Sequence, residues 1–201
     1  RVKKELGINL RVISGAAEAY LDYLGVVNTL PVKNGLIMDT GGASTELIWV
    51  QNGNCEKRIS LPTGSVLLSQ NYNLTDQIKA SDLYKAMTAA ELRLSAVPWI
   101  NNAHNMPLIA LGGSNRTIAK IKRREVTDNI NDLPDIHGMH LPADNIYALF
   151  EKLVSLDKIG RTKIPGLAKI RGDVIVGGLI PISLVLRMLQ IDEVIFSNHG
   201  I

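Results

Sequence analysis

The chain has little of what secreted or membrane proteins need. Its single cysteine, Cys55, cannot form an intramolecular disulfide. Small secreted domains usually depend on disulfides, so we expect a reducing, cytoplasmic location. No hydrophobic run approaches the roughly 20 residues of a membrane-spanning helix, and the first ten residues lack the features of a secretory signal. The sequence therefore predicts no membrane association.

The chain also lacks a large excess of either charge, because its 22 lysines and arginines nearly balance its 19 acids and leave a net charge of +3. Attraction for a polyanion would have to come from local clustering. Aromatic residues make up only 4% of the chain and do not alternate with basic ones, so we expect no nucleic-acid partner. The four histidines lack metal-ligand spacing. With 46% hydrophobic residues, the chain can still bury a substantial core.

Hydrophobic periodicity predicts strands and helices along the whole chain. The strands are predicted at residues 36–39, 45–50, 56–61, 107–111, 174–176 and 193–196. The helices are predicted at residues 16–24, 75–97, 116–124, 144–156, 159–168 and 179–189, with Ser14 capping the first and a loop at 129–141. Asn52-Gly53 is typical of a hairpin turn. A three-strand meander followed by alternating helices and strands predicts an α/β domain.

The stretch DTGGASTE, residues 39–46, lies between two of these strands. The peptide N–H groups of Gly41 and Gly42 can form an anion-binding nest, and Ser44 and Thr45 can add hydroxyl donors. Asp39 offers a hard oxygen ligand for Mg²⁺. Glu46 can orient a water, or it can point away, because neighbouring side chains on a strand alternate between faces. A plain tight turn is the other interpretation of one such motif.

A second glycine turn, Gly112-Gly113-Ser114, also follows a buried strand and leads into a predicted helix. A helix N-terminus favours an anion, so we expect this turn to bind phosphate as well. Basic residues continue along the helix and can bind a polyanion or simply form a solvated helix end. They are Arg116, Lys120, Lys122, Arg123 and Arg124.

Five segments together resemble the exopolyphosphatase and guanosine pentaphosphate phosphohydrolase family. They are SGAAEA (14–19), DTGGASTEL (39–47), LGGSNRTIAKI (111–121), RGDVIVGG (171–178) and VIFSNHG (194–200). That family has the fold of actin, Hsp70 and sugar kinases, in which two ribonuclease-H-like domains enclose a phosphate-binding cleft. The resemblance implies that residues 1–201 are one ribonuclease-H-like domain, the second of a longer two-domain phosphatase, with 1–14 ending the connection between domains.

The resemblance also implies roles for individual residues. Glu18 would be the general base, although a solvated helix carboxylate is the other interpretation of its position. Asp39 would hold Mg²⁺, Glu46 would help to place water or metal, and the glycine turns would hold phosphate. The implied partner is inorganic polyphosphate or guanosine pentaphosphate, and a homodimer of the full-length protein is compatible with the resemblance. A noncatalytic nucleotide sensor, or an ATPase of the same fold, stays open as an alternative.

Overall fold

The computed structural model describes residues 2–9, 12–127 and 129–200. Its centre is a six-stranded sheet with the strand order β3-β2-β1-β4-β6-β5. The strands are β1 (Gly35–Thr40), β2 (Thr45–Gln51), β3 (Asn54–Leu61), β4 (Leu108–Leu111), β5 (His140–Pro142) and β6 (Glu193–Phe196). Strands β1, β4 and β6 run parallel, whereas β2, β3 and β5 are antiparallel to their neighbours. The predicted meander at β1 to β3 is confirmed.

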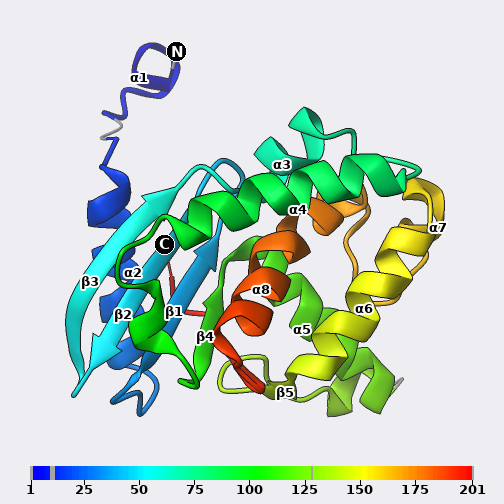
Figure 1. Cartoon of the computed structure of the whole chain (residues 1–201). Helices are drawn as coiled ribbons and strands as arrows, with labels where there is room; N and C mark the ends of the chain where they lie inside the picture. The colour runs from blue at the N-terminus through cyan, green and yellow to red at the C-terminus, as the bar shows by residue number, and fades with distance from the viewer. Residues whose placement is uncertain (1, 10–11, 128, 201) are drawn as a thin grey trace.

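Helices cover both faces of the sheet (Figure 1). They are α1 (Val2–Leu6), α2 (Gly15–Val27), α3 (Ser65–Asn71), α4 (Ala80–Ser95), α5 (Gly112–Val126), α6 (Ala143–Ser155), α7 (Lys158–Thr162) and α8 (Ile175–Leu189), with 3₁₀ turns at Ile100–Ala103, Ile130–Asp132 and Lys169–Arg171. The larger apolar cluster lies on the face covered by α3, α4, α5, α6 and α8. A smaller cluster lies between the other face and α2.

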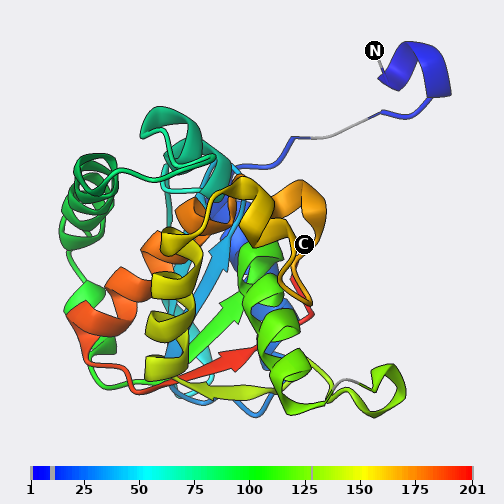
Figure 2. The ribbon, with the colours of Figure 1, turned by 90° about the vertical axis from the view of Figure 1, so that its right-hand side faces the viewer.

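Several local predictions are confirmed. Ser14 caps α2, and its hydroxyl accepts a hydrogen bond from the N–H of Ala17. The hairpin between β2 and β3 has Asn52 and Gly53 at φ values of 52° and 77°, as a turn of the predicted kind requires. None of the helices in the described part of the chain is long and apolar enough to cross a membrane. Helix α1 lies apart from the body of the domain in both views (Figures 1 and 2).

Other predicted boundaries are wrong. Residues 174–176 are not a strand, because α8 begins at Ile175, and its uniformly buried, apolar first turn imitates a strand of a parallel sheet. The helix predicted at 75–97 is shorter, since α4 begins at Ala80, and α3 was missed. The helix predicted at 159–168 is only the five-residue α7. Strand β5 lies at the C-terminal end of the loop predicted at 129–141. Its pairing with β6, and not its local sequence, makes it a strand.

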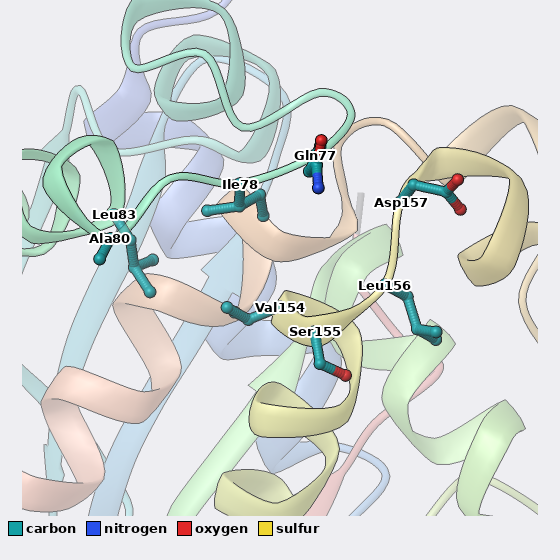
Figure 3. Close-up of a pocket in the computed structure, with 8 residues that line it drawn as sticks. All are labelled: Gln77, Ile78, Ala80, Leu83, Val154, Ser155, Leu156 and Asp157. Carbon is teal, nitrogen blue, oxygen red and sulfur yellow. The ribbon is translucent and has the colours of Figure 1, made fainter.

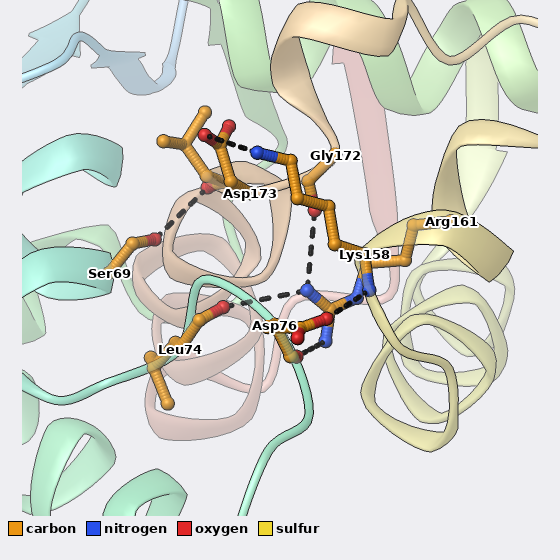
Figure 4. A network of polar contacts seen from close by, with 8 residues as sticks. Ser69, Leu74, Asp76, Lys158, Arg161, Gly172 and Asp173 are labelled. Carbon is orange, nitrogen blue, oxygen red and sulfur yellow. Dashed lines mark hydrogen bonds and ion pairs between the residues drawn. The ribbon is translucent and has the colours of Figure 1, made fainter.

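Arg161 on α7 joins segments that are distant in the chain (Figure 4). Its side chain is fully buried, at 0% exposure. The guanidinium donates hydrogen bonds to the carbonyls of Leu153 (2.9 Å), Asp76 (2.6 Å), Gly172 (3.2 Å) and Leu74 (3.5 Å). Because a buried charge is tolerated only when its donors are satisfied, this network holds α7, the segment before α4 and the turn before α8 together.

Candidate phosphate-binding and catalytic site

Acidic side chains gather at the carboxyl ends of the parallel strands, which is where open α/β sheets usually bind ligands. Asp39 lies near the end of β1 and pairs directly with Glu46 on β2. Directly opposite residues in an antiparallel pair project to the same face, so the two carboxylates lie side by side. Both are buried, with exposures of 8% and 1%. Glu46 therefore belongs to the same cluster as Asp39, and its side chain does not point to the opposite face.

Helix α2 brings Glu18 to this face of the sheet. The approach is close because Gly15, at the start of α2, packs against Ser60 on β3, where a Cβ on the glycine would lie 2.5 Å from the serine Cβ. Ser60 is paired with Glu46 and donates a hydrogen bond of 2.6 Å to Glu46 Oε1. Ser60 thus links the position of Glu46 to the helix that carries Glu18.

Burial among like charges changes the ionisation of the cluster. It raises the pKa of Asp39 from 3.8 to about 7, first because burial disfavours the charged form and then because Asp22, Glu46 and Glu18 repel it. Arg116 acts in the opposite direction. Burial also raises the pKa of Glu46, although hydrogen bonds from Ser60 and Ser44 oppose that shift. A cation bound here would remove this repulsion.

The first glycine turn exposes peptide N–H groups for a clear geometric reason. The carbonyls of Gly41, Gly42 and Ala43 accept hydrogen bonds of 2.9 to 3.1 Å from the backbone at the start of α3. In a planar trans peptide the N–H points opposite to the carbonyl, so the N–H groups of Gly42, Ala43 and Ser44 point away from α3. They donate to no protein group in the described part of the chain. The turn therefore exposes N–H groups of the kind that can form an anion-binding nest. The N–H of Gly41, predicted to be one of them, donates instead to the carbonyl of Ser44 at 3.0 Å.

The second glycine turn lies directly beside the carboxylate cluster. Gly112 has a φ of +87°, and a Cβ there would overlap the Asp39 carboxylate and the Thr40 backbone. The guanidinium of Arg171 lies against the Cα of Gly113. Asn115 secures the turn, because its side-chain amide donates to the Leu111 carbonyl at 2.6 Å. The start of α5 thus meets Asp39 at Gly112, and one arginine lies against the same turn at Gly113.

Two predicted phosphate-binding hydroxyls do not reach the cluster. Thr45 is fully buried, and its hydroxyl donates to the carbonyl of Thr63 at 3.1 Å. Ser114 is buried against Gly178 of α8, which lies on the opposite, larger-core side of the sheet. The sequence pattern cannot distinguish these hydroxyls from Ser44, because only the tertiary contacts determine which way each one points. Ser44 is the predicted hydroxyl that does reach the cluster, where its side chain hydrogen-bonds to Glu46.

The basic residues of α5 do not act as one group. Arg116, near the start of the helix, is the member whose charge acts on Asp39. Lys120 is exposed farther along the helix. Lys122 pairs with Glu125 at 2.9 Å, and Arg123 donates to the Pro134 carbonyl at 3.3 Å. Arg124 lines a small cavity with Lys152. The structure therefore brings Arg116 to the site and directs Lys122 and Arg123 to local partners.

The acidic residues of the site offer few ligands to the predicted Mg²⁺. Within the described ranges, no group of three or more His, Cys, Asp or Glu side chains is arranged to hold a metal ion. Mg²⁺ is commonly held by one or two carboxylates, while water and substrate phosphate complete its shell. Asp39 fits that chemistry, because it is buried and receives no hydrogen bond from a residue that the structure describes. The residues present thus fit Mg²⁺ that is shared with phosphate.

Two of the larger cavities lie outside the carboxylate cluster. A cavity of about 640 Å³ separates residues 77–83 from residues 154–157, and none of its lining side chains belongs to the carboxylate cluster (Figure 3). A second, of about 370 Å³, lies beside the first glycine turn and is lined by Gly42, Ala43, Val66, Leu67 and Gln70. The site itself is an open edge of the domain built by three strands and two helix starts.

Asp22, Ser60 and Arg171 were not among the predicted site residues. Ser60 and Asp22 carry no motif of their own, and only the pairing of β3 and the face of α2 reveal them. Arg171 did have a signal, because it begins the RGDVIVGG segment that the family resemblance already included.

These features define an α/β domain of the actin-like ATPase fold, with glycine turns and carboxylates at the carboxyl edge of its parallel strands. A model of the Ppx/GppA phosphatase family matches residues 1–201, and the chain belongs to this family. The chain is 24% identical to an exopolyphosphatase from Cytophaga hutchinsonii, whose crystal structure gives a TM-score of 0.86 over 99% of this chain and 64% of that one. The Ppx/GppA enzyme of Aquifex aeolicus gives 25% identity and a TM-score of 0.83 over 100% of this chain and 65% of that one.

Curated relatives carry phosphatase names. A bifunctional 3-dehydroquinate synthase/phosphatase of Fusobacterium nucleatum is 29% identical over 99% of this chain and 30% of that protein. A guanosine-5'-triphosphate,3'-diphosphate pyrophosphatase of Pseudoalteromonas translucida is 25% identical over 96% of this chain and 37% of that protein. The chain thus spans about a third of the length of these relatives.

The raised pKa of Asp39 predicts a pH-dependent effect of Asp39→Asn. From pH 4 to 7 the unfolded chain ionises this carboxyl while the folded chain keeps it protonated, so the native state loses stability as pH rises. Without divalent cations, Asp39→Asn should change the free energy of unfolding little near pH 4 and raise it by up to about 4 kcal/mol at pH 8.

Urea unfolding at several pH values checks this expectation. Asp144→Asn, which replaces an exposed carboxylate on α6, is the matched control and should show no such trend. Equal effects of Asp39→Asn at pH 5 and pH 8 would show that Asp39 is not held in a destabilising environment.

Proposed function

We propose that this chain forms one side of the active site of a phosphoanhydride hydrolase that releases orthophosphate from inorganic polyphosphate. The observation that carries the proposal is that both glycine turns lie next to the cluster of carboxylates. The N–H groups of Gly42, Ala43 and Ser44 point outward, and Gly112 places the start of α5 against Asp39. Membership in a phosphatase family and the names of its relatives support the same reaction class.

The residues divide the reaction between binding and proton transfer. The first glycine turn would hold the oxygens of the terminal phosphate, because phosphoryl transfer requires mainly positioning and charge stabilisation. Asp39 would hold Mg²⁺, which when bound neutralises charge on the phosphate oxygens. Glu18 would orient the attacking water and accept its proton. Glu46, held by Ser60, would place water at the same face of the sheet.

Guanosine pentaphosphate is the alternative substrate, since removal of its 5′ γ-phosphate would use the same groups. The test is Mg²⁺-dependent orthophosphate release from long-chain polyphosphate and from guanosine pentaphosphate. The 201-residue chain is compared with a protein extended to the length of its solved relatives. We expect turnover by the extended protein, much weaker turnover by the chain alone, and none with excess EDTA.

The substrate that the extended protein hydrolyses with the higher kcat/KM identifies the enzyme. If the extended protein binds both ligands but releases no orthophosphate, the hydrolase proposal is wrong and a nucleotide sensor explains the site.

A further inference from the structure

Arg58 is an exposed residue of β3 that the proposed reaction has not used, and its side chain reaches the helix that carries Glu18. Its Nε donates a hydrogen bond of 2.9 Å to the carbonyl of Ala16 on α2. Its guanidinium carbon lies 5.1 Å from the ring centroid of Tyr20, a distance at which a cation and an aromatic face attract each other. One side chain of β3 therefore contacts two successive turns of α2.

These two contacts lie on either side of Glu18 along α2. Ala16 and Tyr20 are four residues apart and share one face of the helix, whereas Glu18 lies midway between them on another face. Because a helix rotates about its axis as a unit, contacts at both residues fix the direction in which Glu18 projects. The ends of a helix fray most readily, and the Ala16 carbonyl belongs to the first turn of α2.

Strand β3 also holds Glu46, the other carboxylate that the proposed reaction uses to place water. Ser60 lies two residues after Arg58, so the two side chains project to the same face of the sheet. Ser60 pairs with Glu46 and donates to its carboxylate at 2.6 Å. In agreement with a place beside them, the charge of Glu18 acts on both Glu46 and Asp39. One face of β3 thus contacts both Glu46 and the helix of Glu18.

We propose that Arg58 is a positioning residue for Glu18, because it keeps the first two turns of α2 against β3 and so keeps the Glu18 carboxylate at the site. The inference rests on the proposed function for the role of Glu18 as general base, but the contact between Arg58 and α2 does not require turnover. Arginine suits this position, since its planar guanidinium can donate from Nε and lie over a ring at the same time. Arg58→Lys keeps the charge but not this combination of contacts.

The first test is kinetic and uses the extended protein with the substrate that it hydrolyses faster. Arg58→Met should lower kcat about tenfold, less than the roughly 10²-fold that a 1 Å displacement of a reacting group can cost. KM should not change, because the glycine turns that bind phosphate are unaltered. The kcat of Arg58→Lys should lie between that of Arg58→Met and that of the unmodified protein. Lys57→Met is the matched control and should keep full activity, since Lys57 is an exposed neighbour whose side chain projects to the opposite face of β3.

A double substitution separates positioning from a general loss of structure. If Arg58 acts through Glu18, Arg58→Met should cause little further loss in a protein that already carries Glu18→Gln, so the two effects should not multiply. Effects that multiply would mean that Arg58 acts on the reaction by another route, and this result would overturn the proposal. An unchanged kcat in the single variant Arg58→Met would overturn it as well.

The last measurement does not depend on turnover. Arg58 is exposed, so circular dichroism of the 201-residue Arg58→Met chain should show a folded protein. Amide hydrogen exchange reports local opening, and the amides of residues 19–21 should exchange about tenfold faster in this variant, while those of β1 should not change. Equal exchange on α2 in the two chains would overturn the proposal. An extended protein without turnover would instead overturn the proposed function, and exchange would still decide whether Arg58 holds α2.

Discussion

Glu18→Gln should reduce orthophosphate release by the extended protein by about 10²- to 10⁴-fold, the usual contribution of a general base. The amide keeps the size of the side chain but cannot accept the proton of the attacking water. Glu18 is only partly buried on α2, so the replacement should leave the fold intact. The main change should be in kcat, with little change in KM, because the glycine turns that bind phosphate are unaltered.

The kinetics are measured with the substrate that the extended protein hydrolyses faster. Glu151→Gln, an exposed carboxylate on α6, is the matched control and should retain full activity. If Glu18→Gln retained normal kcat while Glu46→Gln lost it, the base would be Glu46, and Ser60 would be its positioning residue through the 2.6 Å hydrogen bond.

Arg161→Met should cause the largest loss of stability. Methionine can fill much of the space but leaves the carbonyls of Leu74, Asp76, Leu153 and Gly172 without their donor. An unsatisfied buried polar group costs about 1–3 kcal/mol, so we expect a total loss on the order of 4 kcal/mol. Domains are typically stable by about 5–15 kcal/mol, and this loss would leave the variant close to unfolding.

Urea unfolding of the 201-residue chain measures this loss. Arg187→Met is the matched control, because Arg187 is exposed and makes an ion pair with Glu91 at 2.9 Å. An exposed pair contributes at most about 1 kcal/mol. Similar losses for the two variants would mean that the Arg161 network in Figure 4 adds little to stability.

The carboxylate cluster was predicted only in part from sequence. Asp39 and the two glycine turns could be identified, because each occupies a short motif whose residue types suit phosphate and metal. Glu18 could be identified only through the resemblance to a known family. Ser60 could not, because its role comes from the pairing of β3 with β2. Asp22 could not either, since a helix carboxylate has the same local pattern whether it faces solvent or a sheet.

The same distinction explains the fold. Strands β1 to β3 and the cap of α2 were correctly predicted, because alternation, hairpin residues and capping side chains are local signals. The start of α8 was wrong, because complete burial removes the periodicity that separates a helix from a strand. Helix α3 was missed, since its first N–H groups are satisfied by carbonyls of the glycine turn about 24 residues earlier rather than by a local cap.

By itself, the sequence determined that this is an α/β domain with two glycine turns and with three acidic candidate site residues, Glu18, Asp39 and Glu46. These properties follow from residue type and spacing along the chain. Only the tertiary structure decided which hydroxyls and cations reach the acids. Thr45, Ser114 and Lys122 turn elsewhere, whereas Asp22 and Arg116 come close enough to act on Asp39. The physical reason is that a side chain's direction and the charge around it depend on which strands pair and which helix face is buried, and both bring together residues far apart in the chain.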